Sequence, residues 1–407
     1  MSVEVHIDWA GCTFLVGRVH TAEHSQAVSF EYTTEWLARP DGFAIDPTSL
    51  LLRPGAQHSL RLFGALQDCG PDRWGRMLIE RAVRKHVLAR KPYHDLDYAF
   101  ALDDTTRIGS LRFRLGPDGP FLAAREAKIP PLVQLSVLLN AADAVAGDSE
   151  TAEDLRYLLG QGSPLGGARP KSAIVLPDGR LAIAKFPKPD DIRDIAAGEI
   201  LALTLAKRSG IGVPDHMLVK VNGRNISVIT RFDREGEHRV PFISANTILA
   251  LAPGDPGAYT LIADGIRQFG YDTSGDLREL WRRLVFSLLA SNYDDHLRNH
   301  GFLMRAPGRW ALSPAYDLNP VPEIDRRNTP KTPISENQEE ASLDVALEAA
   351  PRFGIKCAEA IVILAEVTTV VTDWRKIGKH LRIKAATLDA YASAFENPIM
   401  EQARKFL

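Results

Sequence analysis

Two predicted β-hairpins with one helix between them constrain the fold of this chain more than any other feature. SAIVL and RLAIAKF flank the turn PDG, while HMLVKV and NISVITRF flank NGR, a strong hairpin signal. Between the hairpins, DIAAGEILALTLAKRSG predicts a helix that ends at Gly210. From about residue 240 the apolar spacing becomes helical, as in DLRELWRRLVFSLLASN. The sequence therefore predicts an α+β chain with a strand-rich front half and a helical back half.

The length of 407 residues exceeds what one hydrophobic core usually supports, so we expect several subdomains. We predict an N-terminal region at 1–130 and an N-lobe with a glycine-rich loop, a lysine-bearing strand and a hinge at 131–238. An all-helical C-terminal lobe with a catalytic loop would follow at 239–407.

The composition limits where the chain works and what it binds alone. A net charge of −2 is too small to hold DNA, so any DNA contact needs a basic partner. Cys12, Cys69 and Cys357 are far apart and odd in number, which favours a reducing cytoplasm over a disulfide framework or a zinc site. The N-terminus has no basic signal-peptide region, and AIVILAEVTTVV is too short to span a membrane. We expect a cytoplasmic protein without membrane contact.

The stretch GQGSPLGGARPKS is the most glycine-dense part of the chain. It is not a Walker A motif, because Pro170 stands where that motif requires Gly before Lys171. Backbone N–H groups at Gly166 and Gly167 could still approach phosphate oxygens, and Lys171 could add charge. The alternative is a plain flexible turn.

Lys185 is placed by strand alternation on one face with Leu181 and Ile183. A lysine among inward aliphatic residues needs an anionic partner. Glu199 lies 14 residues later (199 − 185) on the predicted helix, facing inward. Protein kinases use a strand lysine and a helix glutamate in this way to hold the phosphates of ATP. The alternative is a lysine that extends to solvent at a sheet edge.

Residues 291–303 (SNYDDHLRNHGFL) concentrate titratable side chains directly after a predicted helix. Asp294 and Asn299 match the D-x-x-x-x-N spacing of kinase catalytic loops, in which Asp accepts the hydroxyl proton and Asn binds Mg²⁺. Asp317 in SPAYDLNP could be a second Mg²⁺ ligand. A competing interpretation makes His296 and His300 a zinc pair, although the glutamate of H-E-x-x-H is missing.

The segment VITRFDR ends the second hairpin, where the strand-rich half meets the helical half. In a two-lobed kinase this is the hinge, where Phe232 could stack on adenine and Asp233 could bond the ribose. The alternative is that Arg231, Asp233 and Arg234 form surface ion pairs. Along the chain the glycine-rich loop is followed by the strand lysine, the helix glutamate, the hinge, the D-x-x-x-x-N segment and Asp317. This order favours a two-lobed protein-kinase-like fold.

These motifs resemble the HipA-type serine/threonine kinase toxins of bacterial type II toxin–antitoxin systems. The matching pieces are GGARPK, AIAKF, RFDR, NYDDHLRN and AYDL, and CGPDRWGRMLIER and DDTTRIGSLRF look like that family's N-terminal region. The resemblance covers nearly the whole chain. Tyr293 stands where other protein kinases have Arg before the catalytic Asp, so control by an activation-loop phosphate is not expected.

The resemblance implies Asp294 as the catalytic base and a set of contacts to ATP and Mg²⁺. These are Lys185 at the phosphates, His296 and Tyr316 at the nucleotide, Phe232 and Asp233 at the adenosine, and Asn299 and Asp317 at Mg²⁺.

The resemblance also implies autophosphorylation of a serine in the glycine-rich loop, which ejects the loop and inactivates the enzyme. Ser163 is the nearest candidate; the loop is one residue longer than the resemblance leads us to expect, and Ser172 stays open. A phosphate adds about −1.5 to −2 charge, which would oppose ATP binding.

The implied protein substrate is an aminoacyl-tRNA synthetase. The implied partner is a small DNA-binding, HipB-like antitoxin, through which alone the chain would reach DNA. Two alternatives are a small-molecule kinase and a non-catalytic ATP-binding partner of a DNA-binding repressor.

Overall fold

The computed structural model describes most of the chain: residues 2–21, 27–90, 93–122, 129–160, 169–252 and 254–407. Ser163, Gly166 and Gly167 of the predicted phosphate loop lie outside these residues.

The N-terminal region is built on a five-stranded antiparallel sheet in the order β4-β3-β2-β1-β5. The strands are β1 (Ser2–Trp9), β2 (Cys12–Thr21), β3 (Val28–Tyr32), β4 (Gln57–Ser59) and β5 (Leu111–Arg114). Alternation along β1 buries Val3, Val5 and Ile7 against Phe30 and Phe113, which anchors this sheet in the main core.

The predicted hairpins form a second antiparallel sheet in the order β6-β7-β9-β8. Its strands are β6 (Lys171–Val175), β7 (Leu181–Lys185), β8 (His216–Val221) and β9 (Arg224–Thr230). Both hairpin predictions are confirmed. At the second turn Asn222 and Gly223 have φ of +48° and +80°, as a tight hairpin turn requires.

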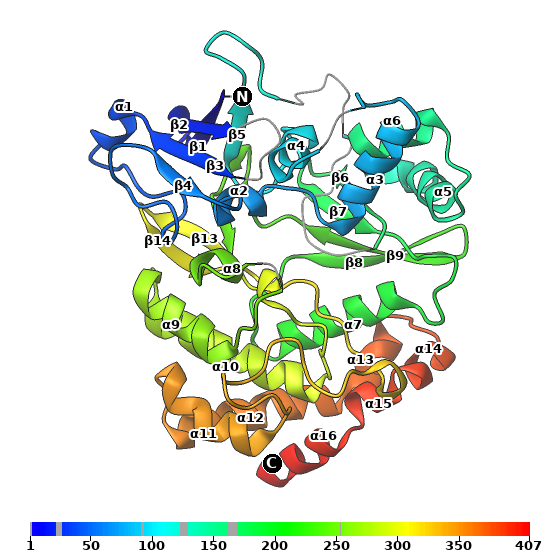
Figure 1. Cartoon of the computed structure of the whole chain (residues 1–407). Helices are drawn as coiled ribbons and strands as arrows, with labels where there is room; N and C mark the ends of the chain where they lie inside the picture. Colours follow the sequence, from blue (N-terminus) through cyan, green and yellow to red (C-terminus); the bar gives the residue numbers. More distant parts are fainter. Residues whose placement is uncertain (1, 22–26, 91–92, 123–128, 161–168, 253) are drawn as a thin grey trace.

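Helix α7 (Ile195–Arg208) joins the two hairpins and packs on this sheet. Figure 1 shows α7 between strands β8 and β9 and the C-terminal helices. The other face is covered by α3 (Arg73–Arg84), α5 (Leu135–Ala146) and α6 (Ala152–Gly160), which share a core with Ile174, Ala184 and Val228. The N-terminal region thus supplies a helix to the lysine-bearing sheet.

The C-terminal part is mainly helical and is organised around α10 (Thr273–Leu289), whose Leu280, Trp281 and Leu289 are fully buried. The larger helices around it are α9 (Tyr259–Phe269) and α12 (Cys357–Thr372). The remaining ones are α11 (Leu343–Ala349), α13 (Trp374–His380), α14 (Ala385–Ala390), α15 (Ala392–Phe395) and α16 (Pro398–Ala403).

The predicted α+β class and two-lobed arrangement are confirmed, but the all-helical C-terminal lobe is wrong. Strands β12 (Phe242–Ser244), β13 (Gly301–Ala306) and β14 (Arg309–Leu312) form an antiparallel sheet there. The segment GFLMRAPGRWAL forms the β13–β14 hairpin, and Gly308 at its turn has φ of +69°. The subdomain boundaries at residues 130 and 238 stay predictions.

Short elements complete the described fold. The helices are α1 (Thr34–Leu37), α2 (Gly64–Asp68), α4 (Asp95–Ala101) and α8 (Ala245–Ile248), and a small hairpin consists of β10 (Arg234–Glu235) and β11 (His238–Arg239). The 3₁₀ turns are η1 (Leu132–Gln134), η2 (Leu297–Asn299), η3 (Glu323–Asp325), η4 (Ala350–Phe353) and η5 (Arg404–Phe406). Within the described ranges, every helix is too short or too polar to cross a membrane.

Candidate active site

The ammonium group of Lys185 lies between two carboxylates where the two lobes meet. It donates to Oε1 of Glu199 and, at 2.7 Å, to Oδ1 of Asp317. The second oxygen of Glu199 accepts a 2.8 Å bond from the Ser227 hydroxyl, which fixes the carboxylate. Burial by itself lowers the pKa of Lys185, but Asp317 and Glu199 raise it well above its usual value. Lys185 is therefore a fixed, permanently charged cation.

Asp317 is held as an anion by its surroundings. Burial raises the pKa of Asp317, but the positive charges of Lys185 and Lys171 have a larger combined effect. The pKa of Asp317 is therefore well below its usual range. Its backbone has φ of +57°, and the Asn319 amide donates to its Oδ1 at 3.2 Å. The Asn319 backbone N–H in turn donates to Asn292 Oδ1 at 3.1 Å. This network connects Asp317 to the segment that precedes Asp294.

The two adjacent aspartates of the predicted catalytic loop have different surroundings. Asp295 is buried and accepts hydrogen bonds from the Tyr259 hydroxyl and, at 3.1 Å, from the His300 ring. The Asp294 side chain is 56% exposed and pairs with the ammonium of Lys331. Asp295 therefore anchors the loop, and Asp294 is the carboxylate that an incoming group can reach.

A cavity of about 310 Å³ brings the predicted phosphate and catalytic residues together. Its lining includes Lys185, Glu199, Asp294 and Asp317, as well as Arg169, Lys171, Lys188, Ser227 and Asn319. A second cavity of about 230 Å³ adjoins it, because Asp294 and Asn319 line both. The arrangement can hold an anionic ligand at Lys185 and present a carboxylate to a group that enters from the second cavity.

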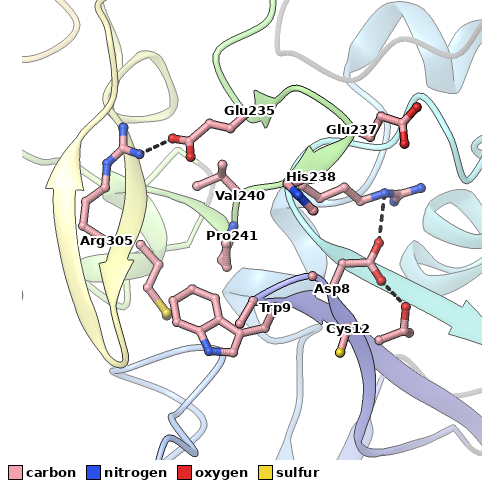
Figure 2. Close-up of a pocket in the computed structure, with 14 residues that line it drawn as sticks. Asp8, Trp9, Cys12, Glu235, Glu237, His238, Val240, Pro241 and Arg305 are labelled. Atoms are coloured by element: carbon pink, nitrogen blue, oxygen red, sulfur yellow. Dashed lines mark hydrogen bonds and ion pairs between the residues drawn. The ribbon is translucent and has the colours of Figure 1, made fainter.

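A third cavity, of about 730 Å³, lies elsewhere, between the tip of the β1–β2 hairpin, the β10–β11 hairpin and β13. Four of its charged side chains form two ion pairs in Figure 2: Asp8 contacts Arg239 at 3.3 Å, and Glu235 contacts Arg305 at 2.6 Å. It shares no lining residue with the Lys185 cavity, and its lining of both acidic and basic side chains indicates no particular ligand.

Phe232 and Tyr316, both predicted at the nucleotide, lie together. Their ring centroids are 5.3 Å apart, within a small cluster that includes Ile108, Phe242 and Leu303. The Tyr316 hydroxyl donates to the backbone oxygen of Arg298 at 2.7 Å, which ties the turn containing Asn299 to the segment before Asp317. An aromatic and aliphatic cluster of this kind suits the face of a purine ring.

Asp233 does not fit the ribose contact predicted for it. Its carboxylate is buried and accepts bonds from Arg231 Nε at 2.8 Å, Arg234 Nη1 at 2.7 Å and the Gly109 backbone N–H at 2.7 Å. Burial raises its pKa, but Arg231 and Arg234 lower it well below the usual range. Asp233 instead joins the hinge to the N-terminal region.

Lys171 lines the Lys185 cavity, and the phosphate contact predicted for it stays a prediction. Its ammonium lies 2.6 Å from Oδ2 of Asp72, and both side chains are 1% exposed. The other oxygen of Asp72 caps α3 by accepting from the Gly75 backbone N–H at 2.7 Å. The charge of Lys171 is thus largely neutralised by a buried carboxylate from the N-terminal region.

The two histidines of the loop do not support the zinc interpretation. His300 is engaged by Asp295 and contacts the Tyr259 ring edge-on at 5.1 Å. His296 is half-buried, and in the part of the chain that the structure describes its Nδ1 has no hydrogen-bond partner. Burial lowers the pKa of His296, although Asp317 and Asp295 oppose this shift. Within the described residues no cluster of three or more His, Cys, Asp or Glu side chains could hold a metal.

Asn299 and Asp317 nevertheless fit a magnesium ion. An amide oxygen and an ionised carboxylate are the hard donors that Mg²⁺ prefers, and this ion usually keeps several waters, so two protein ligands suffice. Asn299 is buried at the end of η2, next to the residue that Tyr316 holds.

The alternative phosphorylation site at Ser172 is inaccessible. It is 1% exposed, lies within β6 opposite Ala184, and its hydroxyl donates to a backbone oxygen at 3.3 Å. Ser163 lies outside the described residues and stays a prediction.

Four residues of this region were missed by sequence reasoning: Asp72, Ser227, Asn319 and Lys331. Ser227 lies opposite Lys185 in the β7–β9 pairing, so its place in the site follows from the strand register and not from a local pattern on β9. Asp72 and Lys331 carry no local signal, because they meet their partners only in the folded chain.

The two lobes, the Lys185–Glu199 pair and the shared cavity define a protein-kinase-like architecture. The chain matches the HipA-like C-terminal domain over residues 163–374, more than half its length, and the HipA N-terminal domain over residues 12–99. It belongs to the HipA family.

Two curated relatives share 29% identity with the chain. "Putative kinase Y4dM" of Sinorhizobium fredii matches over 248 residues, 55% of this chain and 58% of that protein. A "Putative kinase" of Haemophilus influenzae matches over 190 residues, 40% of this chain and 55% of that protein. The chain thus spans little more than half the length of these relatives.

The fold is similar to a solved structure from Shewanella oneidensis MR-1, the toxin–antitoxin complex of HipA, HipB and operator DNA. The TM-score is 0.73 at 17% identity, over 99% of this chain and 97% of that one. At this identity the similarity establishes the fold.

Proposed function

We propose that the chain is an ATP- and Mg²⁺-dependent protein serine/threonine kinase and the toxin of a toxin–antitoxin pair. The observation that carries the proposal is the junction of Lys185 with Glu199 and Asp317 in the cavity that also exposes Asp294. A cation for the phosphates, a metal carboxylate and a reachable base are the parts that phosphoryl transfer needs.

In the proposed reaction, Lys185 holds the phosphates of ATP, and Asn299 and Asp317 would hold Mg²⁺, which neutralises phosphate charge when bound. Asp294 accepts the proton of the acceptor hydroxyl. The acceptor oxygen forms its bond to the γ-phosphorus as the bond from that phosphorus to the bridging oxygen breaks, and ADP leaves.

A protein acceptor is favoured by two exposed isoleucines beside the second cavity. Ile192 and Ile324 are 92% and 91% exposed, and their neighbours Arg193 and Asp325 form an ion pair that lines this cavity with Asp294. Single exposed apolar residues are ordinary. Here, however, two of them lie on segments that an ion pair joins beside the carboxylate of Asp294, and such a surface suits an extended peptide. We propose that they contact the segment that carries the acceptor hydroxyl.

Replacing both residues with serine (Ile192→Ser with Ile324→Ser) is expected to lower phosphate incorporation into proteins of a cell extract about tenfold, since each lost apolar contact weakens acceptor binding. ATP affinity should be unchanged. Val133→Ser, at a site 85% exposed on η1, is the matched control. Equal incorporation by the double variant and the control would remove these residues from acceptor binding.

An aminoacyl-tRNA synthetase is the proposed substrate and a HipB-like antitoxin the proposed partner, in the cytoplasm. The similar Shewanella oneidensis structure contains HipB and operator DNA. A net charge of −2 supports DNA contact through the antitoxin rather than by this chain alone.

The proposed function is tested by incubating the pure chain with ATP, with Mg²⁺ or with a chelator, and measuring intact mass and phosphopeptides. We expect one phosphate, on Ser163, only when Mg²⁺ is present. If the chain also transfers no phosphate to any protein of a cell extract, the proposal that it is a protein kinase is wrong. Transfer to sugars or amino alcohols would then favour the small-molecule kinase, and ATP binding without transfer the non-catalytic partner.

A further inference from the structure

Lys331 pairs with the candidate base from a segment far along the chain. Its ammonium contacts Oδ1 of Asp294, and its backbone N–H donates to the Tyr293 backbone oxygen at 3.1 Å. Both the side chain and the backbone of Lys331 therefore bond to the predicted catalytic loop.

The segment that carries Lys331 is anchored to the first turn of α9. The backbone N–H groups of Tyr259 and Thr260 donate to the oxygens of Pro333 and Ile334 at 3.0 and 3.2 Å, and the Thr260 hydroxyl donates to Glu336 at 2.6 Å. Ile334 is 1% exposed. Tyr259 also holds Asp295, so one helix start positions both the catalytic loop and the lysine beside it.

Lys185 and Lys171, which line the Lys185 cavity, have their charge balanced by carboxylate partners. Lys185 lies between Glu199 and Asp317, and Lys171 faces Asp72. Lys188 also lines the cavity but makes no contact with Asp294 among the described residues. Lys331 and Asp294 are 30% and 56% exposed, so an incoming group can reach the lysine while it stays beside the base.

We propose that Lys331 is a further catalytic residue, whose ammonium contacts the phosphoryl group during its transfer to the acceptor oxygen held by Asp294. This inference rests on the proposed kinase function. In the transition state negative charge spreads over three phosphoryl oxygens, next to the carboxylate that takes the proton. A cation fixed beforehand between these two anionic groups lowers their repulsion and needs no reorganisation during the reaction.

The test compares Lys331→Met, Lys331→Arg and the control Lys376→Met, an exposed lysine on α13. We expect Lys331→Met to lower kcat about 100-fold, as for other preorganised transition-state groups. KM for ATP should change less than about threefold, because the contact forms in the transition state. Lys331→Arg should recover at least about a tenth of the activity, since it restores the charge.

A binding measurement separates this role from a structural one. Calorimetry with Mg²⁺, ADP and aluminium fluoride, a mimic of the transferring phosphoryl group, should show tighter ADP binding than without fluoride. Lys331→Met should lose this gain and keep the affinity for ADP alone.

The inference is overturned if Lys331→Met keeps kcat within about threefold of the wild type. It is also overturned if the Met and Arg variants are equally impaired and melt at a lower temperature. If wild type and Lys376→Met both transfer no phosphate, the proposed function itself has failed and this role fails with it.

Discussion

Replacing Asp294 with asparagine is expected to lower phosphate transfer by about 10³-fold, within the range for loss of a general base. The amide keeps the shape of the carboxylate but cannot accept the hydroxyl proton. Its described ion-pair partner, Lys331, is partly exposed, so little folding energy depends on the pair. ATP affinity and melting temperature should therefore stay close to those of the wild type.

The adjacent aspartate provides the contrast for this experiment. Asp295→Asn removes a buried carboxylate that accepts bonds from Tyr259 and His300, so it should cost about 1–3 kcal/mol of folding free energy. Initial rates of transfer and thermal melting of both variants separate the two roles. Asp294→Asn with more than about a tenth of wild-type activity would exclude Asp294 as the base.

The elements predicted correctly are those with local signals. The Asn222–Gly223 turn and the alternation through Leu181, Ile183 and Lys185 define hairpins that need little help from the rest of the chain. The Lys185–Glu199 contact followed from the inward faces of a strand and the helix after it. Strand β12 was missed because it has three residues and pairs with a strand about 60 positions later, whereas the β13–β14 hairpin has a local signal that was overlooked.

The contacts in the site that the sequence did not predict share one cause, which is partners at long sequence separation. Lys171 meets Asp72 across 99 positions, and Asp233 receives the Gly109 N–H across 124. In both cases a charged side chain that was predicted at the nucleotide forms a hydrogen bond with the N-terminal region. Lys331 was missed for the same reason, since its contact with Asp294 depends on the anchoring of Pro333 and Ile334 to the start of α9 in the folded chain.

Replacing Lys185 with methionine is expected both to abolish phosphate transfer and to destabilise the fold. The variant leaves the buried Glu199 and the half-buried Asp317 together without their cation, and breaking a buried ion pair from one side costs about 3–5 kcal/mol. The free energy of unfolding in urea should fall by this amount. Lys220→Met, on the exposed surface of β8, is the control for the loss of a lysine.

A second substitution distinguishes charge imbalance from lost packing at Lys185. Adding Asp317→Asn to Lys185→Met removes one of the two unpaired carboxylates, so the double variant should recover about 1–3 kcal/mol over Lys185→Met alone. It should remain inactive, because both the phosphate cation and the metal carboxylate are gone. If the double variant is less stable than the wild type by the sum of the effects of Lys185→Met and Asp317→Asn measured separately, the two groups do not interact, and the Lys185–Asp317 contact is not the basis of the site.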